Sequence, residues 1–208
     1  MLKLFLSMSR VIRPLYLPLI ALLGVLLNSC EKEASDKYDI LLQKYDGDYT
    51  ITGMEWMPNS AEVVAVDING DGVASNDLLS EFEKIGVKLS DSHLIPNYGK
   101  RRGKLRAKVP IIDYYQRDDH RVFTVNSPDC FLNFMVASPD SLAFEPFDRL
   151  DWPDDERIGL RTFGGVTVVN AYPSRIDLNI ERYLVYDCLS SEWVVGIVSV
   201  ILSRNGNP

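Results

Sequence analysis

The second half of the chain is one strand-like segment after another, and this pattern constrains the fold more than any other feature. Seven segments are rich in β-branched and aromatic residues, and turn residues such as Asn126-Ser127-Pro128-Asp129 and Pro173-Ser174 separate them. Short strands with tight connections favour antiparallel pairing. We therefore predict a mainly β protein built on an antiparallel β-barrel. The seven predicted strands are Leu105–Tyr115, His120–Val125, Phe131–Val136, Ser141–Phe147, Leu160–Tyr172, Ile176–Asp187 and Glu192–Ser203.

The first half mixes helices and strands. Apolar residues at helical spacing predict a short amphipathic helix over Tyr38–Tyr45 and a second over Asn76–Ile85. Alternating apolar residues predict a strand over Asp48–Met57, with a kink at Gly53, and a Val-rich run predicts another over Glu62–Ile68.

An Asp-rich loop at residues 67–78 follows this Val-rich run. Its Asp67-Ile68-Asn69-Gly70-Asp71-Gly72 segment has the alternating oxygen-bearing side chains of an EF-hand or dockerin loop, and Gly72 permits the sharp turn. Position 12 of such a loop is Leu78, where a bidentate Glu normally binds the ion, so the cage must close differently. The predicted Ca²⁺ ligands are Asp67, Asn69, Asp71 and Asp77 through their side chains, Val73 through its carbonyl, Ser75 through its hydroxyl or a water, and Glu81 as a seventh.

The alternative for this loop is a turn without a metal. Asn and Asp tolerate turn dihedral angles, and in that case Ser75 caps the following helix. A turn requires only one or two such residues, whereas this segment has five, which favours the metal site.

The N-terminal segment reads as a lipoprotein signal peptide over residues 1–29. Lys3, Arg10 and Arg13 precede an apolar run from Leu15 to Leu27, which is too short for a comfortable bilayer span of roughly 20 residues. Leu27-Asn28-Ser29-Cys30 is similar to a bacterial lipobox, and we predict lipidation of Cys30. Residues 30–37 then form a tether, and residues 38–208 form a single domain.

Lipidation would hold the mature protein on a membrane, because several acyl chains together anchor a protein stably. The predicted location is the bacterial cell envelope, on the outer membrane, facing either the periplasm or the surface. Glu31-Lys32-Glu33 is similar to the acidic stretch found near the anchor of surface-exported lipoproteins of the Bacteroidetes group.

The charge of the chain argues against nucleic acid as a partner. The formal net charge is −7, and it becomes −10 once the leader and its three basic residues are removed. The one cationic cluster, residues 100–108, could contact phosphate or an acidic glycan. We interpret it instead as a solvated loop and an edge strand defended by Lys and Arg.

Two cysteines remain after Cys30. Cys130 and Cys188 lie in strand-like stretches of a chain expected in an oxidising compartment. They can form a disulfide or remain two buried thiols, and their separation in space decides between the two.

These features together resemble the lipocalin-like (calycin) lipoproteins of Bacteroidetes. The resemblance rests on a short helix, the Gly47-Asp48-Tyr49 strand opening, the run of antiparallel strands, and a final hairpin that ends near Arg204. In lipocalins a Gly-x-Trp on the first strand packs against an Arg near the end of the last. Here Tyr49 stands at the Trp position, and the resemblance implies that Arg204 contacts its ring.

We predict a calcium-binding, lipid-anchored β-barrel that is not an enzyme. The ion has a structural role, and the barrel binds a small apolar ligand or an envelope protein. One alternative is an interaction subunit of an envelope assembly with a filled barrel. The other is a glycan-acting enzyme, for which the sequence offers no catalytic motif, since it has two histidines and neither a Gly-x-Ser-x-Gly nor a His-Glu-x-x-His segment.

Overall fold

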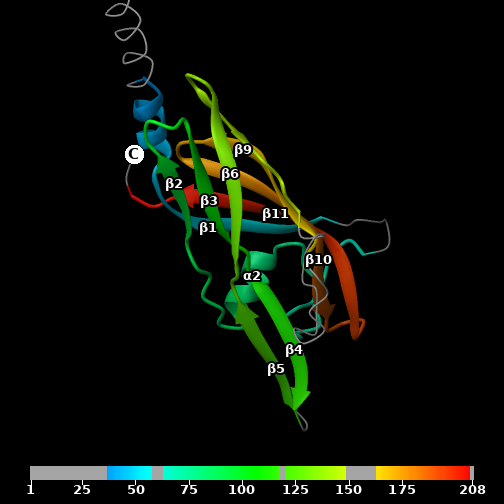
Figure 1. Ribbon diagram of the computed structural model, residues 1–208. Helices are drawn as coiled ribbons and strands as arrows, with labels where there is room; N and C mark the ends of the chain where they lie inside the picture. Colours follow the sequence, from blue (N-terminus) through cyan, green and yellow to red (C-terminus); the bar gives the residue numbers. More distant parts are fainter. Residues whose placement is uncertain (1–36, 58–62, 118–119, 149–162, 207–208) are drawn as a thin grey trace, which may run out of the picture.

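The computed structural model describes residues 37–57, 63–117, 120–148 and 163–206 (Figure 1). The predicted signal peptide and Cys30 lie outside the described residues. Nine strands form one sheet, in the order β7-β6-β3-β2-β1-β11-β10-β9-β8, and β4 pairs with β5 in a separate hairpin. The strands are β1 (Gly47–Met57), β2 (Ser92–Asn97), β3 (Arg102–Lys108), β4 (Ile111–Arg117), β5 (His120–Asn126), β6 (Asp129–Ser138), β7 (Ser141–Phe144), β8 (Phe147–Asp148), β9 (Gly165–Tyr172), β10 (Arg175–Asp187) and β11 (Glu192–Arg204).

The sheet curls into a nearly closed antiparallel barrel, as predicted. Successive strands along the chain are neighbours in the sheet, apart from the β4–β5 hairpin and the step from β7 to β8, which lie at opposite ends of the sheet. β11 returns to pair with β1. β7 comes close to β9, so the two ends of the sheet nearly meet. In Figure 1 the β4–β5 hairpin projects from the barrel at the end opposite the N-terminal helix.

Four strand assignments differ from the structure. The segment predicted as one strand over Ser141–Phe147 is split into β7 and β8 by Glu145 and Pro146, and these two strands lie at opposite ends of the sheet. Ser92–Asn97 forms β2 despite Pro96, because the neighbouring strands β1 and β3 supply its partners. The segment predicted as one strand over Leu105–Tyr115 is split into β3 and β4, with Val109 and Pro110 between them. The Val-rich run before the Asp-rich loop is not a strand, since its described part makes only an isolated bridge between Val66 and Ser75.

Both short helices form where the spacing predicts them. Residues 37–45 are helical, and α2 spans Leu78–Lys84. Within the described residues, neither helix has the length and apolar character needed to cross a bilayer. The predicted kink in β1 is also present, as an irregularity of the β1–β11 register between Ile51 and Gly53.

The interior of the barrel is filled with side chains. Buried and exposed residues alternate along the strands, and the inward-facing side chains join the two helices in one apolar cluster. The largest fully buried side chains are Trp56, Tyr45, Tyr49, Tyr183, Phe82, Leu42, Ile68, Leu78, Leu94, Leu105, Ile112 and Leu132.

One end of the barrel is closed by the helix of residues 37–45 and by Arg204. Tyr49 and Arg204 are register partners on β1 and β11, so the expected pair is adjacent. The guanidinium, however, donates to the backbone carbonyls of Lys44 and Asp46 at the C-terminal end of the helix. A cation there satisfies helix carbonyls that lack a partner and opposes the negative end of the helix dipole. Tyr49 is buried and donates from its hydroxyl to the carbonyl of Tyr45 at 2.8 Å.

Candidate metal site at the Asp-rich loop

The Asp-rich loop begins at Asp67, whose side chain organises the turn. Asp67 Oδ1 accepts a hydrogen bond from the Gly70 N–H at 2.6 Å, and Oδ2 accepts one from the Gly72 N–H at 2.9 Å. Gly70 and Gly72 have φ angles of 76° and 85°, which residues with a side chain rarely adopt. The glycines therefore let two consecutive turns wrap their N–H groups around one buried carboxylate.

Short hydrogen bonds also fix the rest of the loop. Asn69 Oδ1 accepts from the Asp71 N–H at 2.9 Å, and Asp71 Oδ1 accepts from the Val73 N–H at 2.9 Å. Ser75 Oγ accepts from the Asp77 N–H at 3.0 Å. These are the local side-chain to backbone bonds that Asn, Asp and Ser form in turns.

Asp77 caps α2. Its Oδ1 accepts from the Ser80 N–H at 3.1 Å, so the helix cap is Asp77 and not Ser75, which corrects that part of the turn alternative. The same segment is joined to β1, because the Trp56 N–H donates to the Asn76 carbonyl at 2.7 Å.

Glu81 lies on α2 and is fully buried beneath the loop. Its Oε2 accepts from the backbone N–H groups of Ile68 and Asn69, each at 3.2 Å, and from the Asn69 amide at 2.6 Å. The carboxylate is therefore satisfied by donors at the start of the loop, as a buried charge must be.

Lys84 is the cation beside this site. Its ammonium lies 3.0 Å from Asp71 Oδ2 and 3.1 Å from Glu81 Oε1, so these two predicted ligands converge on one positively charged group. The hydrogen bond from Lys84, followed by that from the Val73 N–H, lowers the pKa of Asp71. Reciprocally, the hydrogen bonds to Asp71 and Glu81 raise the pKa of Lys84.

The tip between β10 and β11 clamps the loop from the other side. Asp187 Oδ1 accepts from the Asp67 N–H at 2.8 Å, and the Cys188 N–H donates to the Asp67 carbonyl at 2.7 Å. Burial alone would raise the pKa of Asp187, but hydrogen bonds from Ser190, Asp67 and Leu189 together outweigh it, and the pKa is lowered. Cys130 and Cys188 are buried thiols in the structure, and the Cys188 thiol donates to the Ile68 carbonyl at 3.4 Å.

The seven predicted ligands thus divide into groups. Asp71 and Glu81 meet at Lys84, whereas Asp67 and Asn69 organise the turn and Ser75 and Asp77 bond at the start of α2. Val73 is exposed and donates its N–H to Asp71. Among the described residues, no three His, Cys, Asp or Glu side chains are gathered as a metal cluster. The charges nevertheless suit a cation, because four carboxylates lie between residues 67 and 81 and two of them, Asp67 and Glu81, are buried.

Sequence reasoning missed two members of this site. Lys84 follows Glu81 by three residues on the same helix, a spacing that places two side chains on one face and could have revealed the pair. Asp187 is 120 residues from Asp67, and no local signal connects them.

The comparisons with known proteins add no relative. No protein-family model, no curated protein and no solved structure matches this chain.

Proposed function

We propose that this protein is a lipid-anchored binding protein of the bacterial cell envelope, with a structural calcium site in residues 67–81 and no catalytic role. The observation that carries the calcium site is the meeting of Asp71 and Glu81 at the Lys84 ammonium, in a loop that begins with the buried Asp67. A divalent ion near that position would neutralise the excess of carboxylates. It would also bind the loop more firmly to α2 and to the β10–β11 tip, and so stabilise the folded state.

The proposed anchor is Cys30. Six residues separate it from residue 37, the first described residue of the helix, and the seven Cα–Cα steps from Cys30 span at most about 25 Å. The end of the barrel that carries this helix would then lie close to the membrane, and the Asp-rich loop would lie at the far end (Figure 1). Incorporation of radiolabelled palmitate into the wild-type chain, and its loss in Cys30→Ser, tests this part.

The filled interior supports binding on the outside of the barrel. The inward side chains of the strands belong to the core cluster. An apolar ligand in the lumen would have to displace close-packed side chains, at a cost of the order of several kcal/mol. We therefore favour an envelope protein or a surface-bound ligand as the partner over a small apolar ligand inside the barrel.

Calorimetric titration of Ca²⁺ into the chelator-treated chain of residues 31–208 tests the metal site. The core cluster of the described residues lies wholly within residues 41–202, so the truncation keeps all of its side chains. We expect saturable binding that raises the melting temperature and that Asp71→Ala removes. Asp140→Ala, an exposed aspartate of the β6–β7 turn, is the matched control and should bind as the wild type does.

Lys84→Gln distinguishes a metal site from a self-contained turn. If calcium and the ammonium compete for Asp71 and Glu81, this variant should bind Ca²⁺ at least as tightly as the wild type. An absence of heat and of any melting shift in both the wild type and Lys84→Gln would show that the segment is a turn stabilised by Lys84.

A further inference from the structure

The basic run at residues 100–108 does not form an edge strand. It forms β3 and the turn before it, and β3 lies between β2 and β6 with both of its edges hydrogen-bonded. The interpretation of these cations as protection of an exposed edge is therefore wrong. The side chains form a row on the outer face of an interior strand, where protection against edge pairing is not needed.

Two of the four cations in this row share one carboxylate. Arg102, Lys104, Arg106 and Lys108 alternate with inward-facing residues along β3. The carboxylate of Asp129 on β6 lies 2.7 Å from the Lys108 ammonium and 3.8 Å from Arg106 Nε. In the part of the chain that the structure describes, no carboxylate pairs with Arg102 or Lys104. The excess positive charge is therefore concentrated at the Arg102 end of the strand.

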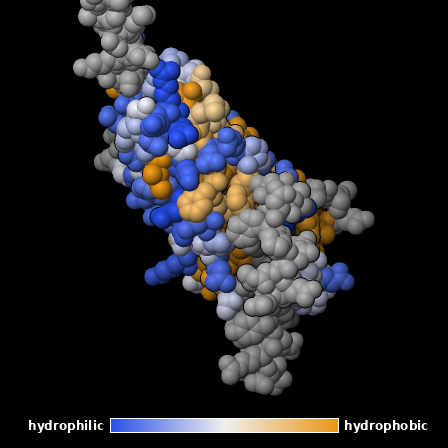
Figure 2. Space-filling model, viewed as in Figure 1, coloured by the Kyte–Doolittle hydropathy of each residue, from blue (hydrophilic) through white to orange (hydrophobic). Residues whose placement is uncertain are grey.

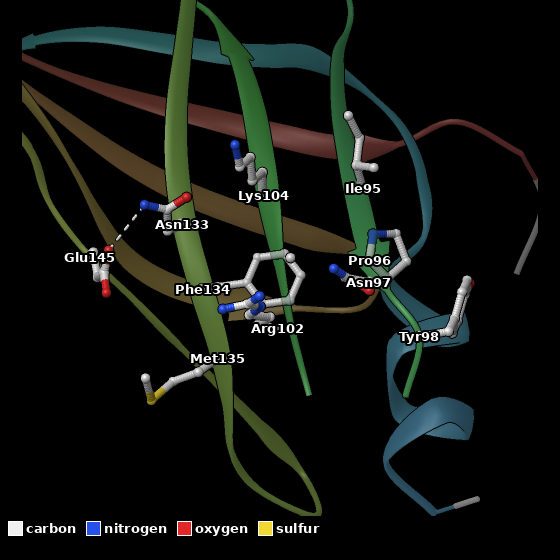
Figure 3. A pocket seen from close by; sticks show the side chains of 11 residues that line it. Ile95, Pro96, Asn97, Tyr98, Arg102, Lys104, Asn133, Phe134, Met135 and Glu145 are labelled. Atoms are coloured by element: carbon white, nitrogen blue, oxygen red, sulfur yellow. Dashed lines mark hydrogen bonds between the residues drawn. The ribbon is translucent and has the colours of Figure 1, made fainter. Parts of the chain in front are cut away.

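A groove of about 700 Å³ lies over these two cations. Figure 3 shows Arg102 and Lys104 on β3, between residues of β2 on one side and of β6 on the other. Lys104 is in register with Ile95 on β2 and Asn133 on β6. Glu145 is the acidic residue among the described residues that line the groove. It lies beyond β6, and the Asn133 amide donates to it at 3.1 Å.

The walls of the groove are apolar and partly exposed. Ile95, Tyr98 and Met135 expose 42%, 44% and 56% of their surface, which is unusual for large apolar side chains grouped beside cations. Figure 2 shows apolar residues interspersed with hydrophilic ones over the face seen in Figure 1, where β2, β3 and β6 lie in front. The groove thus offers cations and apolar surface to the same ligand.

The position of the groove is also fixed. The Tyr98 hydroxyl donates to Asp46 at 2.7 Å, and the Gly99 N–H donates to Asp39 at 2.9 Å. The Arg101 guanidinium lies 4.0 Å from the centre of the Tyr38 ring. These contacts hold the β2–β3 turn, and with it one end of the groove, against the helix of residues 37–45.

We propose that this groove binds the headgroup of an anionic phospholipid. Arg102 and Lys104 hold the phosphate through charge-assisted hydrogen bonds, and Ile95 and Met135 cover the first part of the acyl chains. The inference rests on the proposed lipid anchor, because the tether at Cys30 would bring the groove within reach of the bilayer surface. An acidic glycan would satisfy the cations but would leave the exposed apolar walls without a partner.

Native mass spectrometry of the full chain in a non-ionic detergent tests the proposal. We expect one phosphatidylglycerol molecule to remain bound, and phosphatidylcholine with the same acyl chains to be released. Arg102→Gln/Lys104→Gln should weaken phosphatidylglycerol binding by about tenfold or more, the loss expected for two charge-assisted phosphate contacts. The matched control is Lys44→Gln/Lys88→Gln, which removes the same charge from exposed lysines outside the groove and should retain the lipid.

Three outcomes would overturn the proposal. Equal retention of the two lipids would show that only apolar contacts with the acyl chains hold them, without recognition of the headgroup. Retention by Arg102→Gln/Lys104→Gln would place the site elsewhere. Displacement of phosphatidylglycerol by equimolar inorganic phosphate would show a site for free phosphate.

Cooperative melting of each variant establishes that it is folded, and Lys104→Gln replaces the double variant if that one does not melt cooperatively. In the described part of the chain, Arg102 and Lys104 make no hydrogen bond or ion pair with the Asp-rich loop, so calcium titration tests a separate site, and palmitate labelling tests the anchor.

Discussion

Glu81 provides the strongest test of how the Asp-rich loop is held. Its buried carboxylate accepts hydrogen bonds from the Ile68 and Asn69 N–H groups and from the Asn69 amide, and it pairs with Lys84. In Glu81→Ala the backbone N–H groups of Ile68 and Asn69 lose their acceptor. This loss costs about 1–3 kcal/mol for the buried Ile68 N–H and less for the partly buried Asn69 N–H. The pair with the half-exposed Lys84 adds little, because water screens the ammonium. We expect Glu81→Ala to lower the free energy of unfolding by about 3 kcal/mol.

Glu81→Gln is the matched comparison, because its carbonyl oxygen can still accept from the backbone. It should cost about 1 kcal/mol. Lys84→Met removes only the half-exposed ammonium and should cost less than Glu81→Ala. Urea unfolding in chelator, followed by circular dichroism, measures all three. The reasoning is refuted if Glu81→Ala stays within about 1 kcal/mol of the wild type, or if Lys84→Met costs more than Glu81→Ala.

Adding calcium distinguishes two roles for Glu81, that of a metal ligand and that of a structural hydrogen-bond acceptor. If Glu81 is a ligand as well as a structural acceptor, saturating Ca²⁺ should stabilise the wild type by mass action and should stabilise Glu81→Gln much less. Equal stabilisation of both proteins would leave Glu81 as a structural group alone.

Three further predictions concern the barrel and its ends. Gly196→Ala would place a Cβ 2.4 Å from Trp56 Cζ2 in the core, so we expect a loss of about 1–3 kcal/mol in urea unfolding, smaller in a Trp56→Phe background. The lowered pKa of Asp187 contributes stability above about pH 4, the usual range for an unfolded aspartate, and this stability is lost as pH falls through the folded pKa. Asp187→Asn should therefore flatten the acid limb of a melting-temperature profile, and an unchanged limb would contradict the assignment. Arg204→Lys should lose one of the two carbonyl contacts and increase hydrogen exchange in residues 37–45, with strands far from Arg204 as the internal control.

Local patterns in the sequence determined much of the secondary structure. Alternation and turn residues predicted β5, β6 and β9 to β11 to within a few residues at most ends, and helical spacing predicted α2 and the helix of residues 37–45. The Asp67–Gly72 turn was equally accessible, because its hydrogen bonds join residues at most five positions apart. The sequence also suggested Tyr49 and Arg204 as partners, through a family resemblance.

Pairings between distant segments were not accessible from local patterns. β2 was missed because a six-residue strand that contains Pro96 has a weak signal, and it forms because β1 and β3 supply its hydrogen bonds. The Val-rich run before Asp67 has strong β propensity but makes only one isolated bridge, since propensity cannot supply a partner strand.

The sequence by itself determined that this chain is mainly β, that its strands pair in antiparallel fashion, and that an Asp-rich turn precedes a short helix. Each of these properties depends on residues within a few positions of one another. Only the tertiary structure decided that Asp187 clamps the loop and that Glu81 is buried beneath it. It also decided that β3 lies inside the sheet, where two of its cations line a groove. These properties depend on which strands become neighbours, and the packing of the whole barrel selects that order.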